Sequence, residues 1–258
     1  MHVNAGQIVR RLKKMGDPRV AAHSGRFFKT GVGEYGEGDR FLGIRVPALR
    51  RCAGECRGLS IEEALKLLRS PFHEARLLAL LLLVARYSSA RNEGTRAAVY
   101  RAYLRHTALV NNWDLVDCSA DKIVGAHLFE RDRRPLRRLA RSKSLWERRI
   151  AVMATFHFIR RGDFTDTFAI AELLLDDPED LIHKAAGWML REVGKRDQAA
   201  EEAFLARHCG TMPRTMLRYA IEKFPERTRR AYLVRRGRTG RAPCDGVRRR
   251  PDIAEKAT

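Results

Sequence analysis

The 258-residue sequence predicts an all-α protein whose helical hairpins stack into a right-handed superhelical solenoid. Hydrophobic residues form 45% of the chain, and they recur at helical spacing, as in "EEALKLLRS" and "DLIHKAAGWMLREVGK", not in the alternation of strands. Helix-start signals also recur at nearly constant intervals. These observations favour repeated helix pairs over a mixed fold.

Five helix-start signals define the expected repeat. In chain order they are Ser70-Pro71, Asn111, Ser144, Asp177-Pro178 and Thr211. Ser144 and Glu147 have the spacing of a capping box. Counted from the first residue of each signal, the intervals are 41, 33, 33 and 34 residues, and each also holds a shorter helical stretch. Because DNA binders and protein scaffolds both use such stacks, the repeat alone selects neither function.

We expect one repeat domain over residues 1–233 and a basic, disordered tail over residues 234–258, where Arg, Gly and Pro alternate without an apolar period. Between Arg26 and Pro47, five glycines interrupt the helical pattern and indicate a loop that joins the first helices. Its "GVGEYG" differs from a phosphate-binding loop, because no strand precedes it and no Lys-Ser/Thr follows.

The charge of the chain indicates a polyanionic partner. Lys and Arg outnumber Asp and Glu by 51 to 31, a formal net charge of +20. Such a surplus favours nucleic acid, since each neutralised phosphate releases a condensed counterion. The alternative is that an arginine-rich composition and the basic tail account for much of the charge.

The cysteines and the apolar runs indicate a cytoplasmic protein without a membrane span. The five cysteines are scattered, with no C-x-x-C pair or His cluster suited to zinc, and we expect them to be reduced thiols. No signal peptide opens the chain. The longest apolar run, Leu77 to Ala85, is too short to cross a bilayer.

The stretch "NNWDLVDCSADKIVG" places unusual side chains at the start of one helix. With Asn111 as the cap, Asp114 falls in the first turn, where a carboxylate favours the helix N-terminus. Trp113 and Asp117 then project within about 40° of each other, so an indole and a carboxylate share one face. That face is a candidate site.

The helix that starts at Ser144 carries two arginines near its beginning. Counted from the two caps, Arg149 lies about 60° from the phase of Trp113 and Arg148 about 160° from it, so Arg149 is expected to point toward the Trp113 and Asp117 side. The alternative is that Asp117 and Arg149 form a buried ion pair beneath a core tryptophan. From the spacing alone, both interpretations remain open.

A second tryptophan occupies a different helix. Trp188 shares a face with three cations, Lys184, Arg191 and Lys195, an arrangement suited to contacts with phosphate or sugar. A core tryptophan beneath solvated basic side chains is an equally acceptable interpretation of the same pattern.

From about Gly6 to Leu233, the chain resembles the AlkD family of DNA alkylation-repair glycosylases. The stretches that carry the resemblance are "RFFKTGVGEYGEGDRFLGIRVPALR", "NNWDLVDCSADKIVG", "LWERRIAVMATFHFIRRGD", "LIHKAAGWMLREVGKRD" and "LRYAIEKFPERTRRAYL". The resemblance implies a HEAT-like superhelix that hydrolyses the bond between deoxyribose and a purine alkylated at a ring nitrogen, without metal or cofactor and without a base-flipping pocket. It also implies double-stranded DNA containing alkylated bases as the partner, a monomer, and a nucleoid-associated location on DNA.

The resemblance assigns roles to matching positions of this sequence. Trp113 and Asp117 correspond to the catalytic pair of the family, Arg149 to its catalytic-face arginine, and Trp188 to its second DNA-contacting tryptophan. An expected DNA-contacting set completes the assignment: Arg148, Lys184, Arg191, Lys195, Phe27 and Asn112. Where some members have a tyrosine that contacts the lesion-bearing nucleotide, this chain has Phe27, which keeps the ring and lacks the hydroxyl.

The expected chemistry fits these side chains. A cationic alkylated purine leaves as a neutral base, so the barrier lies largely in forming an oxocarbenium-like sugar. A carboxylate and an indole face stabilise that cation, and Arg149 is expected to hold a neighbouring phosphate. The alternative function is a non-catalytic DNA-binding or protein-scaffold repeat protein, distinguished by tight, salt-sensitive binding without release of a base.

Overall fold

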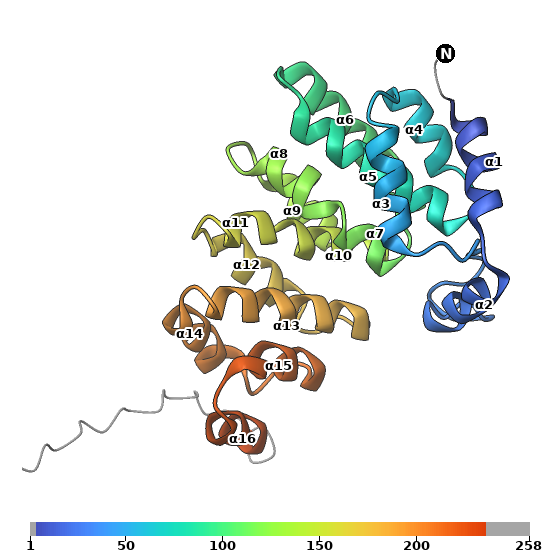
Figure 1. The fold of residues 1–258 in the computed structure, drawn as a ribbon. Helices are drawn as coiled ribbons and strands as arrows, with labels where there is room; N and C mark the ends of the chain where they lie inside the picture. The colour runs from blue at the N-terminus through green and yellow to red at the C-terminus, as the bar shows by residue number, and fades with distance from the viewer. Residues whose placement is uncertain (1–3, 236–258) are drawn as a thin grey trace, which may run out of the picture. The chain divides into compact units, whose positions relative to one another are not determined.

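The computed structural model describes residues 4–235, and within that range the protein is all-α. The β-type pairing in these residues is an isolated bridge between Arg40 and Phe72. The chain forms two compact units, one ending at Leu174 and the other beginning at Leu175 (Figure 1). The predicted boundary between repeat domain and tail lies near the end of the described chain. Helix α16 continues through Arg235, so the first two residues of the predicted tail are helical, and the remainder lies outside the described residues.

The first unit contains most of the helices. They are α1 (Ala5–Met15), α2 (Pro18–Phe27), α3 (Val46–Glu55), α4 (Ile61–Leu68), α5 (His73–Ser89), α6 (Glu93–Arg105), α7 (Trp113–Asp117), α8 (Ala126–Leu128), α9 (Arg134–Ala140), α10 (Leu145–Ala154), α11 (Phe156–Ile159) and α12 (Thr165–Leu173). A 3₁₀ turn over Thr107–Leu109 precedes α7, and a π-helical segment over Asp121–Gly125 separates α7 from α8.

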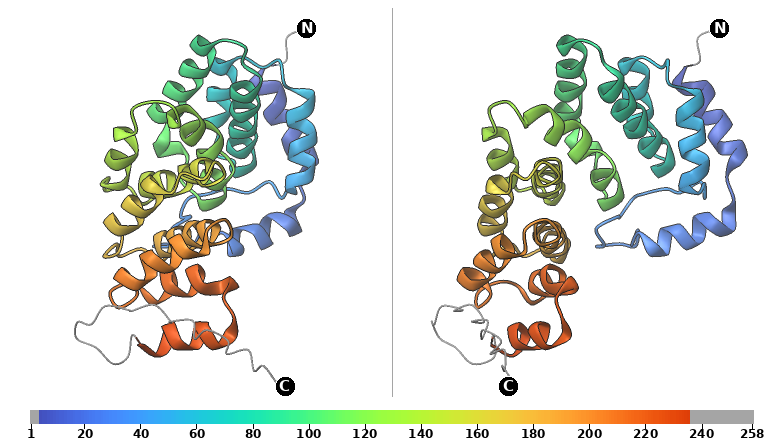
Figure 2. Two further views of the ribbon diagram at one scale, coloured as in Figure 1. Left: turned by 90° about the vertical axis from the view of Figure 1, so that its left-hand side faces the viewer. Right: turned by 60° about the vertical axis from the view of Figure 1, so that its left-hand side comes forward.

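Helix α5 is the centre of the first half of this unit. It packs against α3, α4 and α6, and Leu78, Leu80 and Leu83 are fully buried. Further along, α10 packs against α7 and α9. Helix α2, by contrast, has no buried residue and lies apart from these layers (Figure 2). The packed layers hold α7 and α10 in contact, which is the arrangement that positions the candidate site.

The second unit contains the helices α13 (Asp180–Gly194), α14 (Gln198–His208), α15 (Arg214–Ala220) and α16 (Glu226–Arg235), with a 3₁₀ turn over Ile221–Lys223. Helix α13 packs against α14 and α15. Gly187 allows the close approach to α15, since a Cβ atom there would lie 2.4 Å from the carbonyl oxygen of Met216.

The predicted helix starts agree with the structure to within a residue or two. Ser144 caps α10 and accepts a hydrogen bond from the Glu147 amide, as expected. Ser70 and Asp177 instead accept from the amide two residues ahead, so each closes a short turn before its helix. The helices that follow these turns begin at His73 and Asp180.

The expectation that all five cysteines are reduced is wrong at Cys209. Cys52, Cys56 and Cys118 are free thiols. Cys209 is disulfide-bonded. No helix in residues 4–235 combines the length and the apolar character needed to span a bilayer.

Candidate functional site

The short helix α7 begins one residue later than the sequence predicts. Asn112, not Asn111, is the N-cap, and its Oδ1 accepts a hydrogen bond from the Trp113 amide at 2.8 Å. Asn112 is 0% exposed, and its Nδ2 donates to Asp39 Oδ2 at 3.2 Å. The Asn112 amide therefore binds inside the protein, and its contact with DNA stays a prediction.

Asp117 is held by Arg149. Nε of Arg149 donates to Oδ1 of Asp117 at 2.9 Å, and Nη2 donates to Oδ2 at 2.8 Å. The side chains are 6% exposed for Arg149 and 15% for Asp117, so the guanidinium is enclosed while the Asp117 side chain keeps a small exposed part. Burial raises the pKa of Asp117 above its usual value, and the charge and hydrogen bonds of Arg149 offset this only in part. The predicted direction of Arg149 is confirmed.

Trp113 belongs to a group of aromatic rings. It stacks on Phe28, with ring centroids 5.2 Å apart and an interplanar angle of 18°. Phe27 meets it edge-on at 6.0 Å, and the Phe27 side chain is 59% exposed. Trp113 and Asp117 lie one helical turn apart on α7, so an indole, a carboxylate and an exposed ring occupy neighbouring positions.

Arg148 binds the loop that precedes its own helix. Its Nη1 donates to the carbonyl oxygens of Ser142 and Lys143, each at 3.0 Å. Arg148 is half-buried, and its phase differs from that of Arg149, as the helical count predicts. Its contact with DNA stays a prediction.

The face of α13 around Trp188 is not purely basic. Lys184 pairs with Asp180 at 2.7 Å, Arg191 pairs with Glu222, and Lys195 pairs with Glu192 at 2.6 Å. Nε1 of half-buried Trp188 also donates to Glu192, at 3.2 Å. The sequence analysis identified the three cations around this tryptophan but not the three carboxylates that pair with them, one of which comes from a neighbouring segment. The role of this face in DNA binding stays a prediction.

Sequence reasoning also missed a buried polar cluster beside α7. His73 is 2% exposed, its Nδ1 lies 2.9 Å from Asp39 Oδ2, and its Nε2 lies 2.8 Å from Asp114 Oδ2. Asp39 also binds Arg76 and the capping side chain Asn112. The available signal was the polar "HEAR" at the start of an otherwise apolar helix.

The His73 side chain is an imidazolium at neutral pH. Burial disfavours its charge, but hydrogen bonds to Asp114 and Asp39 outweigh burial and raise the pKa of His73 to about 9. Burial likewise opposes ionisation of Asp39, but His73 and Arg76 hold the pKa of that carboxyl below its usual value. We name Asp39, His73 and Asp114 the histidine cluster.

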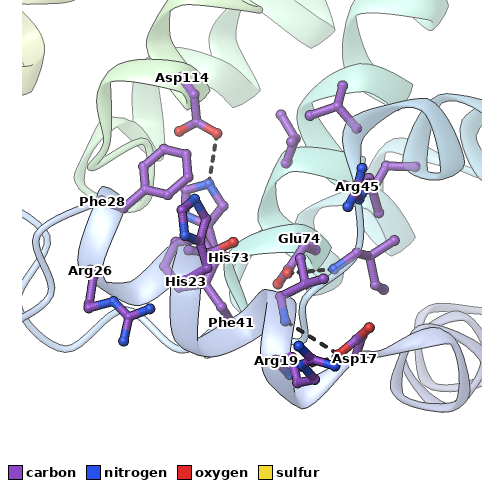
Figure 3. Close-up of a pocket in the computed structure, with 16 residues that line it drawn as sticks. Asp17, Arg19, His23, Arg26, Phe28, Phe41, Arg45, His73, Glu74 and Asp114 are labelled. Atoms are coloured by element: carbon purple, nitrogen blue, oxygen red, sulfur yellow. Dashed lines mark hydrogen bonds and ion pairs between the residues drawn. The ribbon is translucent and has the colours of Figure 1, made fainter.

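A cavity of about 940 Å³ lies beside the histidine cluster. Phe28, Phe41, His73 and Asp114 line it together with Arg19, His23 and Arg26 of α2 and Arg45, the residue before α3 (Figure 3). Glu74 also lines it, and its carboxylate accepts hydrogen bonds from three successive backbone amides over residues 42–44. Trp113, Asp117 and Arg149 are not among the lining residues. Within residues 4–235, no group of three His, Cys, Asp or Glu side chains is arranged to hold a metal ion.

Comparisons with known proteins agree with this architecture. The family model of DNA alkylation repair enzymes matches residues 8–224. A solved structure described as a predicted DNA alkylation repair enzyme from Enterococcus faecalis is similar with a TM-score of 0.63 and 16% sequence identity, covering 82% of this chain and 98% of that chain. At that identity the likeness supports the fold alone. A comparison with curated protein sequences found no match.

Proposed function

Because the chain belongs to the DNA alkylation repair enzyme family, we propose that it is a monofunctional DNA glycosylase that acts on purines alkylated at a ring nitrogen. Its substrates are 7-methylguanine, 3-methyladenine and related cationic lesions in double-stranded DNA. The observation that carries the proposal is the Asp117 carboxylate, which Arg149 fixes through both oxygens on a side chain that stays 15% exposed.

The proposed reaction is hydrolysis of the N-glycosidic bond. The alkylated base carries a positive charge and departs with the bonding electron pair as a neutral base, leaving an oxocarbenium-like deoxyribose. The Asp117 carboxylate stabilises this developing cation and orients the water that attacks the anomeric carbon. The electron-rich indole face of Trp113 stabilises the same cation. Because the leaving group is neutral, the reaction requires no general acid.

Arg149 acts in this scheme as a positioning residue. Its guanidinium makes two hydrogen bonds to Asp117 and is nearly enclosed, a geometry that suits control of the carboxylate better than capture of a phosphate. Without Arg149, the buried position of Asp117 would favour the neutral acid, which stabilises a cation poorly. The ion pair therefore orients Asp117 and favours its ionised form.

DNA binding is supported by the charge of the chain and by the exposed ring beside Trp113. A formal charge of +20 favours phosphate contacts with a strong salt dependence. Phe27, Arg148, Trp188, Lys184, Arg191 and Lys195 are the proposed contact residues. None of Trp113, Asp117 and Arg149 lines the neighbouring cavity, which supports a reaction that does not enclose the base. We further propose a cytoplasmic, nucleoid-associated monomer.

The test is release of a free base from duplex DNA with one alkylated purine, identified by mass. Wild-type protein is expected to release the base above the spontaneous rate, and Asp117→Asn is expected to lose about 10²-fold or more of that rate. Asp121→Asn is the matched control, because Asp121 is also buried and bound to an arginine, Arg160, outside the proposed site. Tight, salt-sensitive DNA binding without base release would instead favour the non-catalytic alternative.

A further inference from the structure

A continuous set of ring contacts joins His73 to Trp113. The Phe41 ring stacks on the His73 imidazole with centroids 4.6 Å apart, and the Phe28 ring lies 5.0 Å from it on a tilted plane. Phe28 in turn stacks on Trp113 at 5.2 Å. An imidazolium attracts aromatic faces through their quadrupoles, so the charged ring fixes Phe28, and Phe28 fixes the indole.

Hydrogen bonds tie both chain neighbours of Trp113 to the same cluster. Asp114, which follows it, accepts from Nε2 of His73, and Asn112, which precedes it, donates to Asp39. Asp39 accepts from Nδ1 of His73 as well. The backbone of Trp113 is therefore held on both sides by groups that meet at one buried histidine.

We propose that Asp39, His73 and Asp114 are positioning residues for Trp113 in base release: the imidazolium clamps the start of α7 and the Phe28 ring, and so fixes the indole face that meets the sugar. The inference rests on the proposed glycosylase function. It adds residues that touch neither DNA nor the reacting atoms and that come from the loop after α2, from α5 and from α7.

The contacts made by the His73 imidazolium depend on pH, and they weaken as the pH rises. The charged groups in contact with His73 are Asp39, from the loop after α2, and Asp114, from α7. Arg76 of α5 binds Asp39. Other titratable or charged groups line the same cavity: Glu74 of α5, and His23 and Arg26 of α2. The pKa of His73 is about 9 because the two carboxylates favour its charge over the effect of burial. The clamp is complete below the usual histidine pKa and is lost as the pH rises through about 9, when one ring nitrogen stops donating.

The experiment uses the full-length protein, three test variants and Trp113→Phe as the fluorescence reference. His73→Gln removes the clamp, Asp114→Asn keeps an oxygen acceptor but removes its charge, and His127→Gln is the matched control. His127 is also a buried histidine that stacks on an aromatic ring, Tyr100, in the same unit. The readouts are kcat and KM for base release from pH 6 to 10, corrected for spontaneous loss, the Tm, and the fluorescence of Trp113 obtained by subtracting the Trp113→Phe spectrum.

We expect His73→Gln to lower kcat by about tenfold or more at pH 7 while changing KM by less than about threefold, since a misplaced group slows the chemical step. It should also abolish a fluorescence transition near pH 9. Asp114→Asn should lower kcat at pH 7 by less than His73→Gln does, and its alkaline transition should move to lower pH because the imidazolium loses a charged partner. His127→Gln should lower the Tm and leave kcat and the transition unchanged.

Failure of this inference and failure of the proposed function give different results. The inference is overturned if His73→Gln and His127→Gln lower the Tm by similar amounts and both keep the wild-type kcat and fluorescence transition. The cluster is then only structural, whereas base release itself stands. If the wild type releases no base but Trp113 fluorescence follows the charge of His73, the clamp stands and the glycosylase function falls.

Discussion

Arg149 on α10 and Asp117 on α7 are joined by two hydrogen bonds, at 2.9 and 2.8 Å, which fix the plane of the carboxylate as well as its position. The contact links segments 32 residues apart in the sequence. Because both partners belong to the protein, the fold itself orients the carboxylate. Preorganisation of this kind is the main source of electrostatic catalysis in enzymes.

The first prediction concerns the geometry of this pair. Arg149→Lys keeps the positive charge but replaces a planar two-pronged donor by a single ammonium. We expect kcat for base release to fall by about 10²-fold with little change in KM, since orientation of Asp117 is lost while DNA contacts remain. The acid limb of the pH profile should move to higher pH, because burial already raises the pKa of Asp117 and the lysine opposes it less.

Arg160→Lys is the control for this measurement, because Arg160 pairs with Asp121 in the same unit. Steady-state rates from pH 5 to 8 for both variants make the comparison. An Arg149→Lys profile that matches the wild type in rate and acid limb would show that the orientation of Asp117 is not needed.

The second prediction concerns a buried carboxyl group in the other unit. Glu201 is 1% exposed, its Oε1 has no hydrogen-bond partner among the described residues, and burial together with the charge of Glu202 raises its pKa to about 8. The folded state therefore holds a proton that the unfolded chain releases near pH 4.5. The free energy of unfolding should fall as the pH rises from about 4.5 and level off above about 8.

Glu201→Gln should remove this loss of stability. The free energy of unfolding of the variant minus that of the wild type should be larger at pH 8.5 than at pH 4.5, by up to about 5 kcal/mol. Urea unfolding at both pH values measures the effect, and Glu202→Gln should keep most of it, because burial is the larger cause of the raised pKa. A wild-type stability that rises between pH 5 and 8 in step with Glu201→Gln would contradict the assignment.

The third prediction concerns the close packing of Gly125 against the end of α10. A Cβ atom at Gly125 would lie 2.2 Å from the carbonyl oxygen of Ala154, the last residue of α10. Gly125→Ala should lower the free energy of unfolding by about 1–3 kcal/mol, because the π-helical segment and α10 must separate. Base release should slow with it, since α10 carries Arg149.

Gly54→Ala is the matched control for that substitution. Gly54 lies in α3, and a Cβ atom there meets nothing within 4 Å. Alanine at this position should stabilise the protein by about 0.5–1 kcal/mol through helix propensity. Denaturant unfolding measures the free energy of unfolding of both variants. Equal changes for Gly125→Ala and Gly54→Ala would show that an added Cβ atom at Gly125 causes no strain.

The fourth prediction concerns Phe27. Phe27→Ala should lower kcat/KM by about tenfold while changing stability by less than about 0.5 kcal/mol, because the ring is largely exposed yet meets Trp113 edge-on. Phe27→Tyr should keep the ring contact and change the ratio of rates on 3-methyladenine and 7-methylguanine. Val32→Ala, at a position 94% exposed in the loop that follows α2, is the control and should leave both quantities unchanged.

Local signals predicted the helices and one of the central contacts. Ser144 caps α10 because a serine followed by glutamate three residues later satisfies the first amides of a helix. The helical phase of Arg149 then predicted its direction toward Asp117 correctly, even though the cap of α7 lies at Asn112 instead of Asn111. The π-helical segment after α7 left this prediction intact because it follows Asp117.

The histidine cluster was not predictable in the same way. His73, Asp39 and Asp114 come from three separate segments, and no periodicity in the sequence encodes how the loop after α2 folds against α5. The same limit explains Asn112, which the sequence places at an exposed helix start and the structure buries against Asp39. The carboxylates around Trp188 likewise include Glu222, from outside α13. Tertiary contacts of this kind override local patterns.

The most direct test of the account is a single-turnover comparison with protein in excess over duplex DNA that contains one 3-methyladenine. Under saturation the observed rate reports base release alone, separate from binding. The account predicts that Asp117→Asn releases the base at least about 10²-fold more slowly than the wild type while its Kd for the same DNA is unchanged. Equal single-turnover rates for the two proteins would contradict the central role of Asp117.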